Sequence, residues 1–107
     1  MRFLNVAFAI FLAVTASAAR AADFTVTLKE HEFSPATLGL PAFKKVTLAV
    51  KNMDTTPAEL GSTTFPVEPT IVEPGGEAQI TISPLQPGPY VLIDVFHNDT
   101  ECNIIAK

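Results

Sequence analysis

One stretch near the end of the chain combines three side chains that can do metal chemistry: the carboxyl group of Asp94, the imidazole of His97 and the thiol of Cys102. Asp94 interrupts the run from Tyr90 to Phe96, in which the other six residues are apolar. An unpaired charge inside a buried run costs about 3–5 kcal/mol, because the carboxylate loses its hydration. Asp94 is therefore expected to have a specific partner.

Each of these residues has more than one interpretation. His97, at a predicted strand end, either ligates a metal or makes a structural hydrogen bond. Asp94 either contacts a metal or caps the following turn by accepting hydrogen bonds from backbone amides. Cys102 is the only cysteine and is expected in the core, with a metal bond or an intermolecular disulfide as alternatives. His31 lies between two glutamates in a segment expected to be extended, which is typical of a solvated face.

Strands are predicted to position these residues. Polar and apolar residues alternate at 23–29, 44–51 and 77–83, which predicts strands with one face in a core. The run at 90–96 follows a Pro-Gly-Pro turn and predicts a strand buried on both faces. Shorter strands are expected at residues 38–42, 58–62, 70–73 and 102–107. Seven or eight strands with turns about every 8–12 residues predict an all-β, antiparallel Greek-key β-sandwich.

The first 21 residues have the features of a cleavable secretory signal. A short positive start precedes an apolar core from Phe3 to Val14, and an Ala-x-Ala pattern of small residues ends at Ala21. The apolar core is shorter than the roughly 20 residues that a membrane span needs. We therefore expect residues 1–21 to be a signal peptide and residues 22–107 to be one domain exported to the periplasm.

The composition of residues 22–107 argues against several classes of function. Five lysines, no arginine and eleven acidic residues give a net charge of −6, which disfavours nucleic acid and anionic lipid as partners. No Gly-x-Ser-x-Gly, His-Glu-x-x-His or phosphate-binding glycine motif is present. A sandwich of this length leaves little room for a deep substrate pocket, so the chain is expected not to be an enzyme.

Residues 87–107 resemble the cupredoxins, a family of small copper proteins. Blue-copper cupredoxins carry a Pro-Gly-x-Tyr turn, a Cys ligand four residues after the Tyr, a His ligand three residues later and a Met ligand about five residues after that. Here Pro87–Tyr90 matches the turn, and His97 matches the histidine. Asp94 stands at the cysteine position, and Cys102 falls near the methionine position. The resemblance implies a cupredoxin-like fold, but blue-copper chemistry needs a Cu–thiolate bond that an aspartate cannot make.

The closer resemblance is to non-blue, exported cupredoxin-like proteins associated with bacterial periplasmic iron-uptake systems. Residues 52–62 resemble their first loop, in which Glu59 is retained while two other acids are replaced. The resemblance implies a copper or iron site with nitrogen from His97, oxygen from Asp94 and Glu59, and an optional sulfur from Cys102. It also implies an accessory role in iron or copper uptake, with a membrane permease or a periplasmic metal-transport protein as the partner.

A second hypothesis is a degenerate cupredoxin-like sandwich that binds no metal. Such a protein would act as an interaction module for a permease or another periplasmic protein. The two hypotheses differ in a simple observable, since only the first requires the purified protein to bind a transition metal ion.

Overall fold

The computed structural model describes residues 21–107, so all but the last residue of the predicted signal peptide lies outside the described part. Nine strands form in residues 21–107, and no helix does. The strands are β1 (Phe24–Lys29), β2 (Glu32–Ser34), β3 (Thr37–Leu40), β4 (Val46–Asn52), β5 (Ala58–Gly61), β6 (Thr70–Val72), β7 (Glu77–Ile82), β8 (Gly88–Asp94) and β9 (His97–Ala106). Accordingly, this part of the chain has no helix suited to crossing a membrane.

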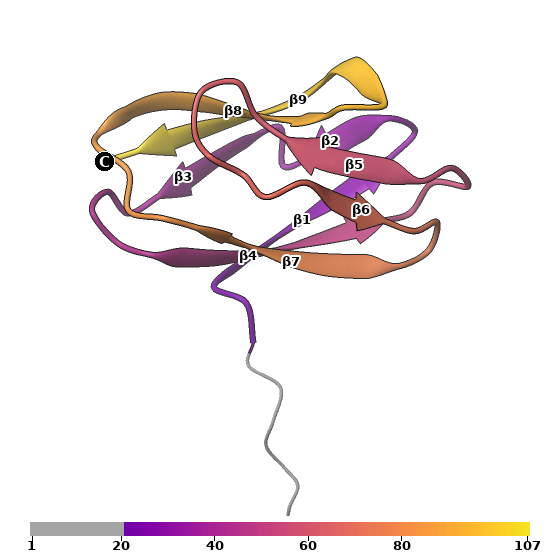
Figure 1. Cartoon of the computed structure of the whole chain (residues 1–107), viewed down its shortest axis with the longest axis horizontal. Coiled ribbons are helices and arrows are strands. Elements are labelled where there is room, and N and C mark those ends of the chain that lie inside the picture. Colours follow the sequence, from indigo (N-terminus) through magenta and orange to yellow (C-terminus); the bar gives the residue numbers. More distant parts are fainter. Residues whose placement is uncertain (1–20) are drawn as a thin grey trace, which may run out of the picture.

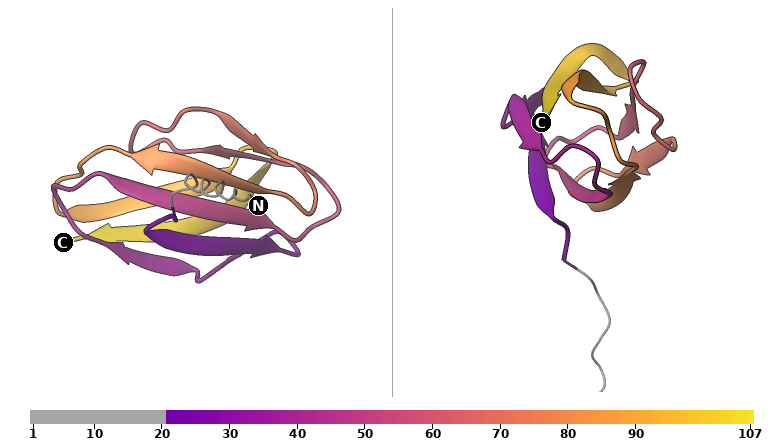
Figure 2. Two further views of the ribbon diagram at one scale, coloured as in Figure 1. Left: turned by 90° about the horizontal axis from the view of Figure 1, so that it is seen from below. Right: turned by 90° about the vertical axis from the view of Figure 1, so that its left-hand side faces the viewer.

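The strands form two sheets that face each other (Figures 1 and 2). One sheet has the order β2-β1-β4-β7, and the other has the order β3-β9-β8-β5-β6. The predicted all-β sandwich is confirmed, with nine strands where seven or eight were expected. It is not wholly antiparallel, because β1 pairs parallel with β4 and β3 pairs parallel with β9.

The core lies between the sheets and follows the alternation seen in the sequence. Successive side chains of a strand point to opposite faces, so the buried residues of β1, β4 and β7 recur at every second position, with Ala49 of β4 buried as well on the opposite face. The other sheet contributes buried residues from its central strands β8 and β9. The fully buried side chains include Val26, Leu28, Leu48, Val50, Leu60, Val72, Ile82, Leu92, Cys102 and Ile104.

The final hairpin differs from the prediction in two ways. The strand at 90–96 was predicted to be buried on both faces, yet β8 ends at Asp94, and Val95 and Phe96 are 41% and 50% exposed in the following turn. β9 then starts at His97, five residues before the predicted start at Cys102. The outer face of this sheet is open to solvent, so the apolar run alternates between buried and partly exposed side chains.

One end of the sandwich collects the polar residues of interest. β1 and β4 run parallel, so the loops that follow Lys29 and Asn52 lie at the same end. The β8–β9 turn lies at that end too, at the upper right of Figure 1. The hydroxyl of Thr100 on β9 reaches the backbone carbonyl of His31, which joins the two sheets there.

Candidate metal centre

Asp94 is buried, with 1% of its surface exposed, and both of its oxygens are bonded. Oδ1 accepts hydrogen bonds from the backbone N–H groups of Glu59 and Phe96, both at 3.0 Å. The bond to Phe96, two residues on, is the pattern of a side chain that caps a turn. Oδ2 lies 2.9 Å from Nδ1 of His97. Asp94 therefore ties β5, the β8–β9 turn and the imidazole together.

His97 opens β9 with a ring whose orientation is fixed. A carboxylate oxygen only accepts hydrogen bonds, so Nδ1 of His97 carries the proton and donates it to Asp94. The other ring nitrogen, Nε2, is then unprotonated in the neutral imidazole. The side chain of His97 is 32% exposed, whereas that of Asp94 is 1% exposed. This arrangement, a carboxylate behind a histidine, is the one that metal-bound histidines usually have.

His31 sits in a tight turn between β1 and β2 that the sequence did not indicate. Glu30 and His31 have φ angles of 52° and 60°, in the left-handed region that few residues other than glycine adopt. The backbone N–H groups of both residues donate to the carboxyl group of Asp54, from the loop after β4. The hydroxyl of Thr100 donates to the carbonyl of His31 at 2.8 Å. The backbone of His31 is thus held on both sides.

The two histidine rings stack on each other. The ring centroids of His31 and His97 are 4.1 Å apart, and the planes are inclined by 30°. Nδ1 of His31 lies 3.5 Å from Oδ2 of Asp54, so each imidazole has a carboxyl group beside its Nδ1. The expectation of a solvated face for His31 is therefore only half right. Its side chain is 48% exposed, but it packs against the histidine predicted to ligate metal.

Glu59 does not bring its carboxyl group to this site. Ala58 and Leu60 are buried, so the side chain of Glu59 between them points to the outer face of the sheet. Leu60 is the residue paired with Asp94, and both point into the core. Glu59 contributes its backbone instead, since its N–H donates to Asp94 and its carbonyl accepts from Val95.

Cys102 lies in the core, as one interpretation of the sequence predicted. Its side chain is fully buried, and the Sγ–H donates to the carbonyl of Pro35 at 3.5 Å. Burial raises the pKa of the thiol from 9.0 to about 11, because a thiolate would lose its hydration there. The thiol form is therefore strongly favoured at neutral pH, which is the opposite of what a reactive or metal-binding cysteine shows.

The raised pKa predicts a specific loss of stability in alkali. The folded state holds the Cys102 proton more tightly than the unfolded state, so its contribution is complete below pH 9 and is lost as pH rises through 11. Between pH 8 and pH 11, the free energy of unfolding measured with urea should therefore fall by about 2–3 kcal/mol more for the wild type than for the Cys102→Ala variant. Parallel pH profiles for the two proteins would contradict this burial effect.

The four predicted ligands do not converge on one point. Asp94 and His97 are in contact, Glu59 points away, and Cys102 is held in the core by Pro35. Among residues 21–107, no group of three or more His, Cys, Asp or Glu side chains is placed to hold a metal ion together. A blue-copper site does not fit these residues, because no thiolate stands beside the imidazole. Imidazole nitrogen, as at His97 with Asp94 behind it, is a ligand type that suits a borderline metal ion.

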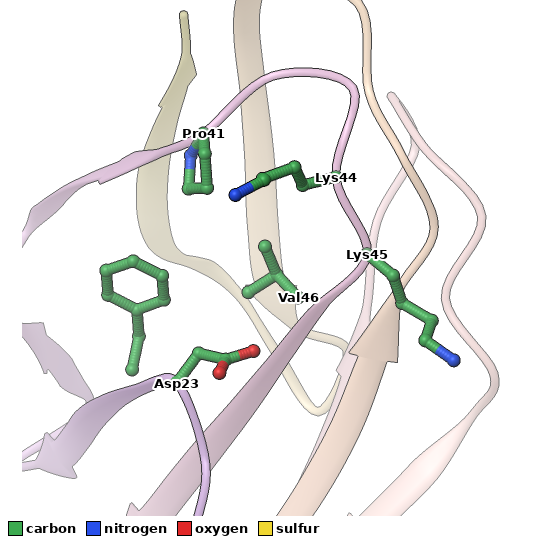
Figure 3. Close-up of a pocket in the computed structure, with 6 residues that line it drawn as sticks. Asp23, Pro41, Lys44, Lys45 and Val46 are labelled. Atoms are coloured by element: carbon green, nitrogen blue, oxygen red, sulfur yellow. The ribbon is translucent and has the colours of Figure 1, made fainter.

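Concave spaces lie at both ends of the sandwich. A cavity of about 440 Å³ beside the histidines is lined by Glu30, His31, Glu32, His97, Asp99 and Thr100. A second cavity of about 450 Å³ lies at the start of β1 and β4 (Figure 3). There the Lys44 side chain extends toward Pro41, and Asp23 is bonded to the backbone of Thr47. We assign the candidate site to the histidine end, because the other end has no convergent donors.

The residues that hold His31 were not predicted from the sequence. Asp54 and Asn52 read as ordinary loop residues, yet Asn52 is 1% exposed and its Oδ1 accepts from the N–H of Asp54 at 2.9 Å. The signal in the sequence was the position of Asn52, directly after the alternating residues 44–51, where a polar side chain that continues the inward face needs hydrogen-bond partners.

Comparisons with known proteins agree with this fold. A family model described as a cupredoxin-like domain matches residues 2–106. A curated relative, an uncharacterized protein of Rickettsia prowazekii (strain Madrid E), is 36% identical over 78 residues. The match covers 73% of this chain and 62% of the relative, so the chain spans less than two thirds of that protein.

Solved structures give the same result at lower identity. Reduced auracyanin from Roseiflexus castenholzii has a TM-score of 0.66 at 14% identity, covering 83% of this chain and 99% of that one. A purple cupredoxin from Nitrosopumilus maritimus has a TM-score of 0.61 at 16% identity, covering 79% and 100%. These identities show the fold alone. The family match over nearly the whole sequence shows more: this chain belongs to the cupredoxin-like domain family.

Proposed function

We propose that this chain is an exported cupredoxin-like protein that binds a transition metal ion through Nε2 of His97. The observation that supports it is the buried Asp94, which stands at the blue-copper cysteine position and holds Nδ1 of His97 at 2.9 Å. A carboxylate in that position fixes the tautomer and makes the free nitrogen a better ligand. Asp94 is then a positioning residue, because its two oxygens are already bonded.

The donor set favours a harder metal chemistry than that of a blue-copper carrier. Imidazole nitrogen suits Cu(II), Zn(II) and iron, whereas Cu(I) prefers thiolate and thioether ligands. Cys102 is excluded from the proposed site by its burial and its raised pKa. When bound, the metal would supply a Lewis-acidic centre, and copper or iron could also exchange an electron. The chain itself would supply Nε2 of His97 as the ligand, Asp94 to orient it, and the acidic residues Glu30, Glu32 and Asp99 of the adjacent cavity.

We further propose an accessory role in iron or copper uptake in the periplasm. This part is supported by the signal-like sequence of residues 1–21 and by the resemblance to the non-blue exported proteins. The partner would be a membrane permease or a periplasmic metal-transport protein. In this role the protein binds and hands over a metal ion and is not an enzyme.

Replacing His97 with alanine should weaken metal binding by about tenfold or more, since removing a second-shell residue alone costs 10–100-fold. The test is titration of the purified wild type and His97→Ala proteins with Cu(II), Zn(II) and Fe(II) under controlled redox conditions. Asn98→Ala, at the exposed neighbouring position, is the control and should bind like the wild type. Equal stoichiometry and affinity for wild type and His97→Ala would rule out His97 as a ligand.

A metal-free interaction module is the second candidate. It is supported by Val95 and Phe96, which are exposed in the turn directly before His97, at a place where a soluble monomer gains nothing from apolar side chains. The same titration separates the candidates. If neither Cu(II), Zn(II) nor Fe(II) binds more tightly than micromolar, the metal-binding proposal fails and this candidate remains.

A further inference from the structure

We propose that His31 is a second ligand and that Nε2 of His31 and Nε2 of His97 bind one transition metal ion between them. This inference rests on the proposed function of His97 and names its partner. Nothing in the spacing of the sequence suggested it, because the two residues are 66 positions apart, with His31 in the β1–β2 turn of one sheet and His97 on β9 of the other.

The position of His31 is held by contacts that no isolated hairpin would have. Its N–H donates to Oδ2 of Asp54 at 3.0 Å, and its carbonyl accepts from Thr100 at 2.8 Å. These bonds stabilise a left-handed conformation that is uncommon for a residue other than glycine and more frequent for histidine than for most residues. Strain of this kind persists only where surrounding contacts enforce it, and it gathers at functional sites.

Each ring has a carboxyl group near its Nδ1, at a hydrogen-bond distance for His97 and at a longer one for His31. Asp94 lies beside Nδ1 of His97 at 2.9 Å, and Asp54 lies beside Nδ1 of His31 at 3.5 Å. The hydrogen bond to Asp94 leaves Nε2 as the free nitrogen of His97, whereas the longer contact with Asp54 places a carboxyl group near Nδ1 of His31 without a hydrogen bond to the ring. The Asp94–His97 pair is the second-shell arrangement that metal-binding histidines use, and Asp54 lies where it could support His31 in the same way after a small shift.

The distance between the rings suits a shared ion. Two imidazole nitrogens at about 2 Å from one metal, with an angle of 90–110° between the bonds, place the ring centroids roughly 4.5–5 Å apart. The centroids of His31 and His97 are now 4.1 Å apart and the planes are inclined by 30°. In this stack the Nε2 lone pairs lie in nearly parallel planes, so binding one ion would require the centroids to separate by up to about 1 Å and the His31 ring, which is not hydrogen-bonded through Nδ1, to rotate until both Nε2 atoms face the same point.

The surroundings indicate what kind of ion would bind. The cavity of about 440 Å³ beside the rings carries Glu30, Glu32 and Asp99, so its rim is acidic and attracts cations. No third protein donor joins the two imidazoles within residues 21–107, so the remaining coordination positions would hold water or an incoming ligand. Affinity for nitrogen sites is greatest for Cu(II) among the divalent metals of the first row. The site is thus suited to an exchangeable dication, with Cu(II) held most tightly.

The chain offers a direct spectroscopic test, because His31 and His97 are its only histidines. The protein, expressed from the full-length sequence with ¹⁵N-histidine, is loaded with one equivalent of Cu(II) and examined by electron paramagnetic resonance and pulsed hyperfine spectroscopy. We expect two coordinated histidine nitrogens in the wild type. His31→Asn is expected to show one, with Cu(II) affinity lowered about tenfold or more, since asparagine tolerates the left-handed turn but lacks the ring.

Each outcome decides one of the two proposals. One histidine nitrogen in the wild type, lost in His97→Ala and unchanged in His31→Asn, overturns the shared site and leaves the proposed function intact. No histidine nitrogen in the wild type overturns both. If His31→Asn is unfolded by circular dichroism, His31→Phe replaces it, because phenylalanine keeps the ring contact and removes the ligand. Unchanged nitrogen count and affinity in either folded variant excludes His31.

Discussion

The Asp94→Ala protein is expected to be less stable than the wild type by about 3 kcal/mol and to lose metal binding as well. The substitution leaves the N–H groups of Glu59 and Phe96 without their acceptor at a partly buried place, where each unpaired donor costs about 1–2 kcal/mol. The same change frees the His97 ring. Urea unfolding and a Cu(II) titration measure the two effects.

Asp94→Asn separates these two roles of one side chain. Its amide oxygen can still accept from Glu59 and Phe96, so the loss of stability should be only about 1–2 kcal/mol. Its amide nitrogen, however, would donate to Nδ1 of His97, which moves the ring proton to Nε2 and blocks that atom as a ligand. We therefore expect a nearly stable protein with Cu(II) affinity lowered about 10–100-fold. Wild-type affinity in Asp94→Asn would show that Asp94 does not position His97; Glu73→Gln, at an exposed position, is the control.

The fold could be predicted from the sequence because the core is formed by alternation. Val26 and Leu28, or Ile80 and Ile82, are two residues apart, and a strand between a core and solvent converts that spacing directly into burial. The prediction for residues 90–96 was wrong because this run does not alternate. An uninterrupted apolar run does not indicate which residues turn outward or where the turn falls, so Val95 and Phe96 were assigned to the strand.

The candidate site could be predicted only in part. Asp94 and His97 are three residues apart, so their contact is local and visible in the sequence. His31 could not be connected with them, because its turn has no glycine or asparagine and is stabilised by Asp54, 23 residues further along the chain. Glu59 was chosen as the nearest acid in its loop, but strand alternation directs its side chain outward. Which side chains meet at the site therefore depends on hydrogen bonds between distant parts of the chain, and a single sequence does not show these bonds.

Replacing Asn52 with alanine is expected to lower both the stability of the protein and the Cu(II) affinity of the histidine site. The amide is 1% exposed; its Nδ2 donates to the carbonyls of Thr56 and Val72 at 2.9 and 3.0 Å, and its Oδ1 accepts from Asp54. Asn52→Ala leaves two carbonyls and one N–H unpaired, so the free energy of unfolding should fall by about 3–4 kcal/mol. Because Asp54 holds the turn at His31, Cu(II) affinity should fall too.

Asn52→Asp tests whether the N–H donors of the Asn52 amide account for its contribution to stability. The two side chains have nearly the same shape, but the carboxylate would face the carbonyl oxygens of Thr56 and Val72 with no proton to donate. A buried charge in this position should lower stability at pH 7 by more than Asn52→Ala does, since desolvation adds to the lost hydrogen bonds. Urea unfolding of the three proteins at pH 7 measures the order. If Asn52→Asp is as stable as the wild type, the amide does not organise this loop, and the link from Asn52 through Asp54 to His31 is wrong.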